Sequence, residues 1–192
     1  MALAYTNLQL EIREISLKNR PIELYEASKK GTVPVLISLD KEVIDESIEI
    51  MLWALKRDPN QTWLVENHMK ELDMIEKNDY LFKKWLDRYK YHDRYPNNSK
   101  EFYRKKCDNI LVEYEEKLQT TKYFLKDSLS LSDIAIFPFV RQFANVDYKW
   151  FENKYDKLVL WLERICSSDL FIDIMQKYDE WESNNKNIII NN

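Results

Sequence analysis

The chain of 192 residues contains a single glycine, Gly31. Tight turns and phosphate-binding loops depend on glycine, because it adopts backbone conformations that other residues avoid. Neither the G-x-G-x-x-G fingerprint of dinucleotide-binding domains nor a P-loop can be formed with one glycine. The sequence therefore excludes both nucleotide-binding motifs, and it leaves few places for tight turns.

Composition and charge argue against several classes of partner. Apolar residues make up 45% and charged residues 32% of the chain, which is ordinary for a globular protein. The formal net charge is −4 and no basic block stands out, so we expect no nucleic acid partner. No apolar run is long enough to cross a bilayer, so we expect no membrane partner either.

The N-terminus and the cysteines favour a cytoplasmic location. The first residues, MALAYTNLQLEIREI, contain no basic region and no cleavage signal for secretion. Cys107 and Cys166 lie far apart in helical patterns, which favours reduced, packed thiols over a disulfide. His68 and His92, the only histidines, have no partner at ligand spacing, so we assign no metal ligand.

Residues 1–57 alternate short helices and strands. The stretch MALAYT has the pattern of a helix end, with Asn7 as its C-terminal stop. Alternating apolar and polar residues then predict a half-buried strand over 8–15. The remaining elements predicted in this part are a helix over 19–28, strands over 33–38 and 43–44, and a helix over 45–57 with Asp45 as its N-cap.

Helical periodicity dominates after a linker at 58–63. Residues 64–182 are predicted to form an all-helical domain, and the tail at 183–192 lacks periodicity and is expected to fray. The predicted helices cover 64–77, 79–91, 99–120, 130–146, 155–167 and 168–178. The sequence thus predicts a small α/β domain at 1–57 followed by an all-α domain.

Ser130 and Asp133 form a capping box in the stretch LSLSDIAIF. The Ser130 hydroxyl can accept from the N–H of Asp133, and the Asp133 carboxylate can accept from the N–H of Ser130. The helix that follows is almost wholly apolar, so we expect it at the centre of the helical domain. We interpret the motif as a folding signal and not as a functional site.

The stretch KGTVPVLISLDKEVIDES offers a candidate binding site. Glu46 and Ser47 fall in the first turn of a helix, where free N–H groups attract a carboxylate. Ser47 could add its hydroxyl and Glu46 could bind an ammonium group, so that the pair would hold an amino-acid zwitterion. On the residues alone, simple helix capping is the favoured alternative. If the bond between Val33 and Pro34 is cis, the backbone of Val33 could pair with an extended peptide.

Three motifs in order resemble the cytosolic glutathione transferase superfamily: GTVPVL, VIDES with its helix, and LSLSDIAIFPFVRQF in a helical domain. The likeness is closest to omega-like and related bacterial members, and it covers almost the whole chain. It implies a truncated thioredoxin-like N-terminal domain followed by a helical glutathione transferase C-terminal domain, usually in a homodimer. It also implies glutathione as co-substrate, with thiol transfer or conjugation to a small electrophilic or disulfide substrate.

The resemblance also implies a set of binding residues. In that family the proline of VPVL is cis and the residue before it pairs with the cysteinyl part of glutathione, which points to Pro34 and Val33. The family's acid–serine pair holds the γ-glutamyl end, which points to Glu46 and Ser47 and reverses the preference for simple capping. A basic residue before the proline of NKP contacts glutathione, and Arg20 in KNRP has that place.

The chain departs from the family at its start. The family begins with a strand and a loop that carries the catalytic residue, a cysteine in omega-like members, before the first helix. Here MALAYTNL resembles the end of that helix, and Cys107 and Cys166 do not match the catalytic position, so we assign no catalytic residue. Without the first strand, the strands at 8–15 and 33–38 would not be neighbours and would leave unpaired edges.

Three explanations of this departure are open, in order of preference. The true start lies upstream of Met1, the gene is truncated and its product crippled, or the shortened domain persists as a scaffold or binding protein. Two function hypotheses follow: a glutathione transferase-like enzyme, and a non-catalytic member of the fold that acts through protein partners.

The segment 80–95 is dense in aromatic and basic residues. Trp85, Tyr89 and Tyr91 could line the electrophile pocket that the resemblance implies. Packing in a core or an interface is the favoured alternative for such a helix face.

Overall fold

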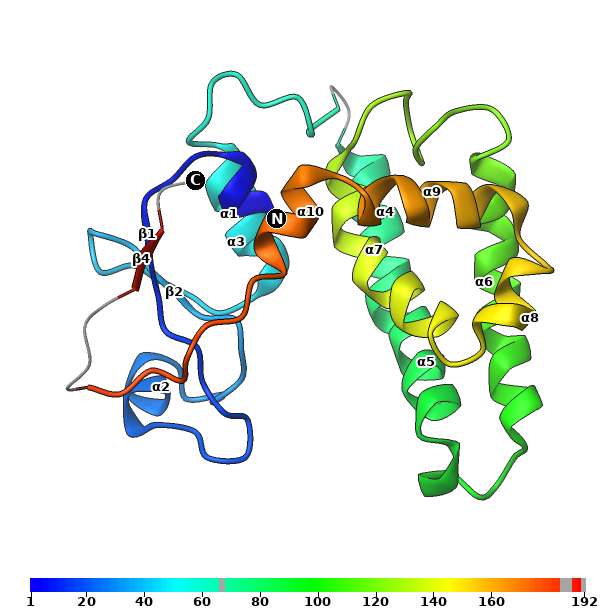
Figure 1. The fold of residues 1–192 in the computed structure, drawn as a ribbon, viewed down its shortest axis with the longest axis horizontal. Coiled ribbons are helices and arrows are strands. Elements are labelled where there is room, and N and C mark those ends of the chain that lie inside the picture. Colours follow the sequence, from blue (N-terminus) through cyan, green and yellow to red (C-terminus); the bar gives the residue numbers. More distant parts are fainter. Residues whose placement is uncertain (66–67, 184–187, 191–192) are drawn as a thin grey trace. The chain divides into compact units, whose positions relative to one another are not determined.

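The structure, a computed structural model, describes residues 1–65, 68–183 and 188–190. Its internal contacts divide the chain into two compact units, one formed by 1–61 with 169–192 and the other by 62–168 (Figure 1). The first is a small α/β unit and the second is helical, which confirms the predicted fold class. Residues 169–182 cluster with the first unit although the sequence grouped them with the helical domain, and the predicted domain boundaries stay predictions.

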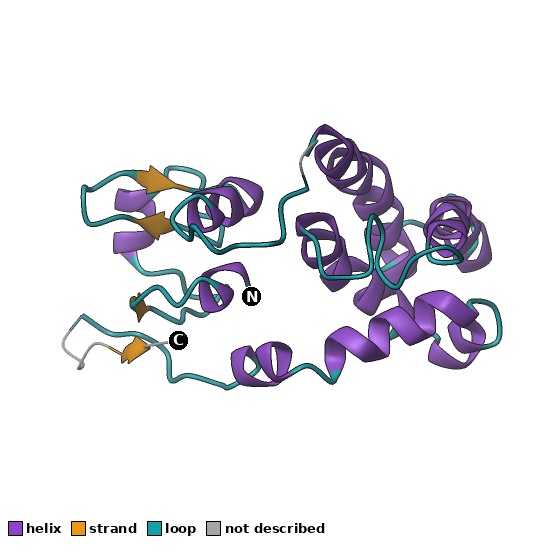
Figure 2. Cartoon of the chain, turned by 90° about the horizontal axis from the view of Figure 1, so that it is seen from above, coloured by secondary structure: helices purple, strands orange, loops and turns teal. Residues whose placement is uncertain are grey.

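The described strands form two antiparallel sheets of two strands each, both in the first unit (Figure 2). One sheet pairs β2 (Leu36–Ile37) with β3 (Val43–Ile44). The chain turns between them at Lys41, which has a left-handed φ of +62°, and the N–H of Glu42 donates to the hydroxyl of Ser38 over 3.1 Å. The predicted turn is therefore confirmed, and β3 has its predicted bounds, whereas β2 is shorter than the strand predicted over 33–38.

The other sheet pairs β1 (Leu10–Ile12) with β4 (Ile188–Ile190). The prediction that the C-terminal tail frays is therefore wrong for 188–190, whereas 184–187 and 191–192 lie outside the described residues. Three successive β-branched isoleucines favour a strand, and β1 offers them an unpaired edge. β1 and β2 belong to different sheets, which confirms that these two strands are not neighbours.

The first helix of the chain links two other helices of the first unit. The chain begins with α1 (Ala2–Tyr5), which packs against α3 (Ser47–Leu55) and α10 (Asp169–Ile174), while α2 (Ile22–Ala27) lies between β1 and β2 in the sequence. Asn7 adopts a left-handed φ of +51° just after α1, as predicted for the residue that stops a helix.

The predicted N-cap of α3 is wrong by one residue. Glu46, and not Asp45, occupies the N-cap position, and its backbone is extended. The Asp45 carboxylate is instead bound by Ser28 and Lys30, so it is not available to the first turn of the helix.

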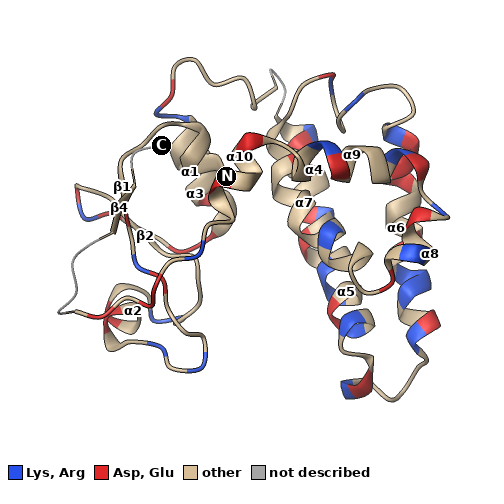
Figure 3. Ribbon diagram, viewed as in Figure 1, with Lys and Arg blue, Asp and Glu red and all other residues tan. Residues whose placement is uncertain are grey.

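The second unit contains α4 to α9. Their bounds are α4 (Met69–Lys77), α5 (Lys83–Lys90), α6 (Lys100–Lys117), α7 (Leu131–Ala144), α8 (Tyr148–Glu152) and α9 (Asp156–Cys166), with a π-helical stretch at Asn78–Phe82 and a 3₁₀ turn at His92–Arg94. The sequence did not predict α8, a five-residue helix whose first turn is capped by the carboxylate of Asp147. Lysine and arginine residues occur along α5 and in the first half of α6 (Figure 3).

Helix α7 lies in the core of the second unit, as predicted from its apolar sequence. Leu131, Ile136 and Val140 have no exposed surface, and the helix runs through Pro138 without ending. It packs against α4, α5, α8 and α9. The buried aromatic residues of this unit are Trp63, Phe82, Tyr89, Tyr103, Tyr114, Phe124, Phe137, Phe143, Phe151, Tyr155 and Trp161.

Asp133 joins three parts of the second unit. The capping box with Ser130 is present, and the N–H of Ser130 donates to Oδ2 of Asp133 over 3.0 Å. Oδ1 of the same carboxylate accepts from the N–H of Phe124 over 3.0 Å and from Nε1 of Trp161 over 2.8 Å. The sequence predicted the cap but not the links to the loop before α7 and to α9.

We expect Asp133→Ala to lower the free energy of unfolding by about 3 kcal/mol or more, because it leaves several buried donors without an acceptor. Urea denaturation followed by circular dichroism measures the loss. Asp127→Ala is the matched control, since Asp127 is exposed and accepts from the N–H of Lys122, and it should cost less than about 1 kcal/mol. Equal losses in the two variants would contradict the role given to Asp133.

Candidate functional site

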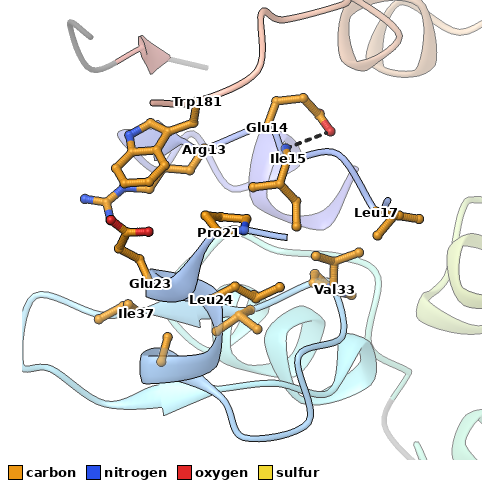
Figure 4. A pocket seen from close by; sticks show the side chains of 13 residues that line it. Arg13, Glu14, Ile15, Leu17, Pro21, Glu23, Leu24, Val33, Ile37 and Trp181 are labelled. Atoms are coloured by element: carbon orange, nitrogen blue, oxygen red, sulfur yellow. Dashed lines mark hydrogen bonds between the residues drawn. The ribbon is translucent and has the colours of Figure 1, made fainter. Parts of the chain in front are cut away.

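A cavity of about 500 Å³ lies in the first unit (Figure 4). Its walls come from the chain just after β1, from α2 and the residue before it, from β2 and the residues before it, and from the C-terminal segment. The lining residues are Arg13, Glu14, Ile15, Leu17, Pro21, Glu23, Leu24, Ala27, Val33, Pro34, Val35, Ile37 and Trp181. The lining is mostly apolar, with a few charged groups, which is the usual character of a small-molecule site.

Val33 and Pro34 form the β2 wall of this cavity. The peptide bond between them is cis, as the sequence resemblance implied. Val33 is 47% exposed, and within the described residues no hydrogen bond engages its N–H or C=O. Its backbone is therefore free to pair with an extended ligand.

Glu46 and Ser47 stand together at the start of α3. Glu46 is exposed, and Oε1 of its carboxylate accepts from the ammonium of Lys30 over 2.6 Å. Ser47 is also exposed, and the described part of the chain offers its hydroxyl no hydrogen-bond partner. The Lys30 contact shows that the position of Glu46 suits an ammonium group, the role that the zwitterion argument gave it.

The carboxylate of Asp45 organises the loop beside Glu46. It accepts from the hydroxyl of Ser28 over 2.6 Å and from Lys30 over 2.9 Å. These two hydrogen bonds, that of Ser28 first, hold the pKa of Asp45 below its usual value. The pKa of Lys30 is raised by its hydrogen bonds to Glu46 and Asp45.

The single glycine of the chain shapes the same loop. Gly31 has a left-handed φ of +59°, and its N–H donates to the carbonyl of Ser28 over 3.0 Å. A Cβ at this position would lie 2.3 Å from the ring of Tyr25. Both the backbone conformation and the close ring therefore require glycine, and the turn that it allows holds Lys30 next to α3.

Arg20 is exposed and precedes Pro21, which lines the cavity, but Arg20 itself is not among the lining residues. Glu46 and Ser47 do not line the cavity either. The predicted site residues therefore form two pairs and one separate side chain: Val33 with Pro34, Glu46 with Ser47, and Arg20.

Trp181 is a cavity residue that sequence reasoning missed. Its backbone N–H donates to the carbonyl of Glu14 over 2.7 Å, and the Arg13 guanidinium lies 4.8 Å from the centre of its ring. This contact brings the C-terminal segment onto the chain that leaves β1. An isolated tryptophan in a polar tail was the only available signal, and it does not indicate which surface the ring will cover.

Neither cysteine is placed to supply a reactive thiol. Cys107 is fully buried, and burial raises its pKa. Burial also raises the pKa of Cys166, although the nearby Arg141 partly offsets the effect. Both thiols are therefore protonated at neutral pH, which agrees with the prediction of packed, reduced cysteines.

The described residues contain neither a candidate metal site nor a candidate membrane-spanning helix. Among them, no three histidine, cysteine, aspartate or glutamate side chains lie close enough to hold a metal ion together. The described helices also include none with the length and apolar character needed to span a membrane.

Family models match most of the chain. Residues 1–62 match the model of the glutathione S-transferase N-terminal domain, and residues 79–169 match that of the glutathione S-transferase C-terminal domain. A comparison with curated protein sequences gives no significant match.

Many solved structures share the fold. The bacterial glutathione S-transferase BphK, solved as a ternary complex, is 18% identical with a TM-score of 0.76, over 90% of this chain and 88% of its own. Glutathione transferase URE2P6 from Phanerochaete chrysosporium, in complex with oxidized glutathione, is 13% identical with a TM-score of 0.78, over 90% and 86%. A glutathione S-transferase from Methylobacillus flagellatus KT with GSH bound is 20% identical with a TM-score of 0.71, over 90% of each chain.

We expect Ser28→Ala to raise the pKa of Asp45, because it removes the hydrogen bond that contributes most to lowering it. A carboxyl with a lowered pKa stabilises the fold above its unfolded pKa, and this contribution is lost as the pH falls through the folded pKa. The variant should therefore lose less stability on acidification than the parent. NMR titration of the Asp45 carboxyl and acid denaturation measure the two effects, and Ser38→Ala, in the β2–β3 turn, should change neither.

Proposed function

Because the chain belongs to the glutathione S-transferase family, we propose that its first unit binds glutathione as co-substrate, for thiol transfer or conjugation to an electrophile. The glutathione bound in two of the similar structures supports this ligand. The other substrate would be a small electrophile or a disulfide that reacts with the glutathione thiol. From the family we also carry over a homodimer and a cytoplasmic location.

The free backbone of Val33 is the observation that carries the proposal. Its N–H and C=O are unpaired on the wall of a cavity, and glutathione is a short extended peptide that can bond to both groups. The cysteinyl part of glutathione would pair there, beside Pro34. Backbone pairing fixes the direction of the ligand, and the remaining contacts then hold its ends.

The start of α3 would hold the γ-glutamyl end. The ligand carboxylate would accept from the Ser47 hydroxyl and the free N–H groups of the first turn, and its ammonium would bind the Glu46 carboxylate. In this structure the Lys30 ammonium is bound to the Glu46 carboxylate. The ligand ammonium would replace it there, while Lys30 would remain bound to Asp45. Arg20 would add a contact through its guanidinium.

No residue of this chain is assigned to ionise the glutathione thiol. The two cysteines are protonated and lie in helices α6 and α9 of the second unit. The alternative function, a non-catalytic member of the fold acting through protein partners, therefore stays beside the first. Calorimetric titration with glutathione separates the two hypotheses. A folded protein that does not bind glutathione would exclude the enzyme hypothesis and favour the non-catalytic one.

We expect Glu46→Gln and Ser47→Ala each to weaken glutathione binding. The first change removes a charge-assisted hydrogen bond worth about 1.5–3 kcal/mol, so the loss should be roughly tenfold or more, and the second should cost less. Titration calorimetry measures both dissociation constants. Glu49→Gln is the matched control, because Glu49 is exposed on the same helix and carries the same charge, and it should bind as the parent does.

We expect Lys30→Met to strengthen glutathione binding at low salt. The change removes the tethered ammonium that competes for Glu46, and because exposed ion pairs are weak, we expect a gain of at most roughly fivefold. The neighbouring Lys29→Met makes the same charge change at an exposed position and should leave the affinity unchanged. Weaker binding by Lys30→Met would mean that Lys30 contacts the ligand itself.

A further inference from the structure

The segment from Lys83 to Lys106 has a charge opposite to that of the chain. It contains nine lysines and arginines and three acidic residues, a net charge of +6, so the rest of the chain carries −10 to give the total of −4. The expectation that no basic block stands out is therefore wrong for this segment. It forms α5, the 3₁₀ turn and the start of α6, where blue residues gather in Figure 3.

Three of these cations surround one tryptophan. Lys84, Arg88 and Lys106 lie 5.4, 5.1 and 5.6 Å from the centre of the Trp85 ring. Trp85 in turn stacks on Tyr103, with the ring centres 6.4 Å apart. We call Trp85 and its three cations the Trp85 cluster.

The acidic residues of the segment have hydrogen bonds or ion pairs with residues outside the Trp85 cluster. Oδ2 of Asp87 accepts from the hydroxyl of Tyr95 over 2.6 Å, and Oδ1 of Asp93 lies 3.1 Å from Nε2 of His92. Glu101 lies in the first turn of α6, where hydrogen bonds from the backbone and from Ser99 lower its pKa. Within the described residues, Lys84, Arg88 and Lys106 have no carboxylate partner.

Like charges that share one ring repel one another, and none of the three cations has a carboxylate partner among the described residues to offset this repulsion. Contacts with the ring hold the cations in place, so they lose less side-chain entropy when they bind an anion than free lysines would. Phe102 lies beside them, 40% exposed, with Lys106 5.2 Å from its ring centre. Exposed aromatic residues together with arginine are typical of protein-binding surfaces.

We propose that the Trp85 cluster with Phe102 binds an acidic segment of a partner protein, several of whose aspartates and glutamates pair with the three cations. A nucleic acid fits less well. Tyr103 and the three cations already contact the Trp85 ring, so a base would have to displace them to stack on it. The surface belongs to the second unit alone and does not depend on glutathione.

The test uses a fluorescent peptide of about 12 aspartate and glutamate residues as probe, with anisotropy as the readout and the full chain as the protein. We expect binding that weakens as salt rises from about 50 to about 200 mM, because the contacts are exposed ion pairs. The triple variant Lys84→Gln, Arg88→Gln, Lys106→Gln should bind roughly tenfold more weakly at the lower salt concentration.

The matched control is Lys18→Gln, Lys29→Gln, Lys177→Gln, which removes the same charge from exposed positions outside the segment. It should bind the peptide as the parent does. Equal losses in the two triple variants, or no binding by the parent, would overturn the proposal. So would tighter binding of an oligouridylate with the same number of charges, which would assign the surface to nucleic acid. Circular dichroism checks folding, and the three single variants replace the triple variant if it does not fold.

Discussion

The second unit depends on two carboxylates buried at the start of α7. Glu71 and Asp133 have no exposed surface, and burial raises the pKa of each, while hydrogen bonds from the surrounding chain act in the opposite direction. Glu71 accepts from the N–H groups of Val65 and Leu131, over 3.2 and 3.1 Å, and so ties α4 to the linker and to α7. Asp133 accepts from the N–H of Phe124 in the loop before α7 and from the indole of Trp161 in α9. A buried carboxylate is tolerated only where donors meet it, so these two carboxylates fix where α7 begins.

The first unit is held together differently, by short polar contacts around one turn. Its sheets have two strands each, and few of its side chains are fully buried, so hydrophobic packing alone leaves its loops weakly constrained. Gly31 allows the tight turn, the turn presents Lys30, and Lys30 links the carboxylates of Asp45 and Glu46. The groups that position this loop are thus the groups that the proposed ligand would engage. Binding there would exchange an internal ion pair for a ligand ion pair, so it would not bury a new charge.

Local signals in the sequence predicted local structure well. The capping box at Ser130, the helix stop at Asn7 and the hairpin turn at Lys41 each rest on residues a few positions apart, whose chemistry leaves few alternatives. The sequence did not predict β4 or the position of Trp181, because both depend on an edge and a surface formed about 170 residues earlier in the chain. Asp45 failed as the predicted N-cap for the same reason, since Ser28 and Lys30 reach it from a loop that the helix pattern does not include. Among the site residues, Val33 and Pro34 came from the family resemblance and not from periodicity.

The net charge of this chain does not show how its charges are distributed along the sequence, and that distribution affects which partners it can bind. A total of −4 suggests a mildly acidic surface, yet it is the difference between +6 in residues 83–106 and −10 elsewhere. The two units would consequently recognise anions by different physics. In the first, free backbone groups and a helix start act over one hydrogen-bond length, so salt screens them little. In the second, three cations at the surface attract an anion over a distance comparable with the Debye length of about 10 Å at 0.1 M salt, so ionic strength controls their binding strongly. A change in salt should therefore affect a partner on α5 and α6 much more than glutathione in the first unit, and the two kinds of binding can be separated by this response alone.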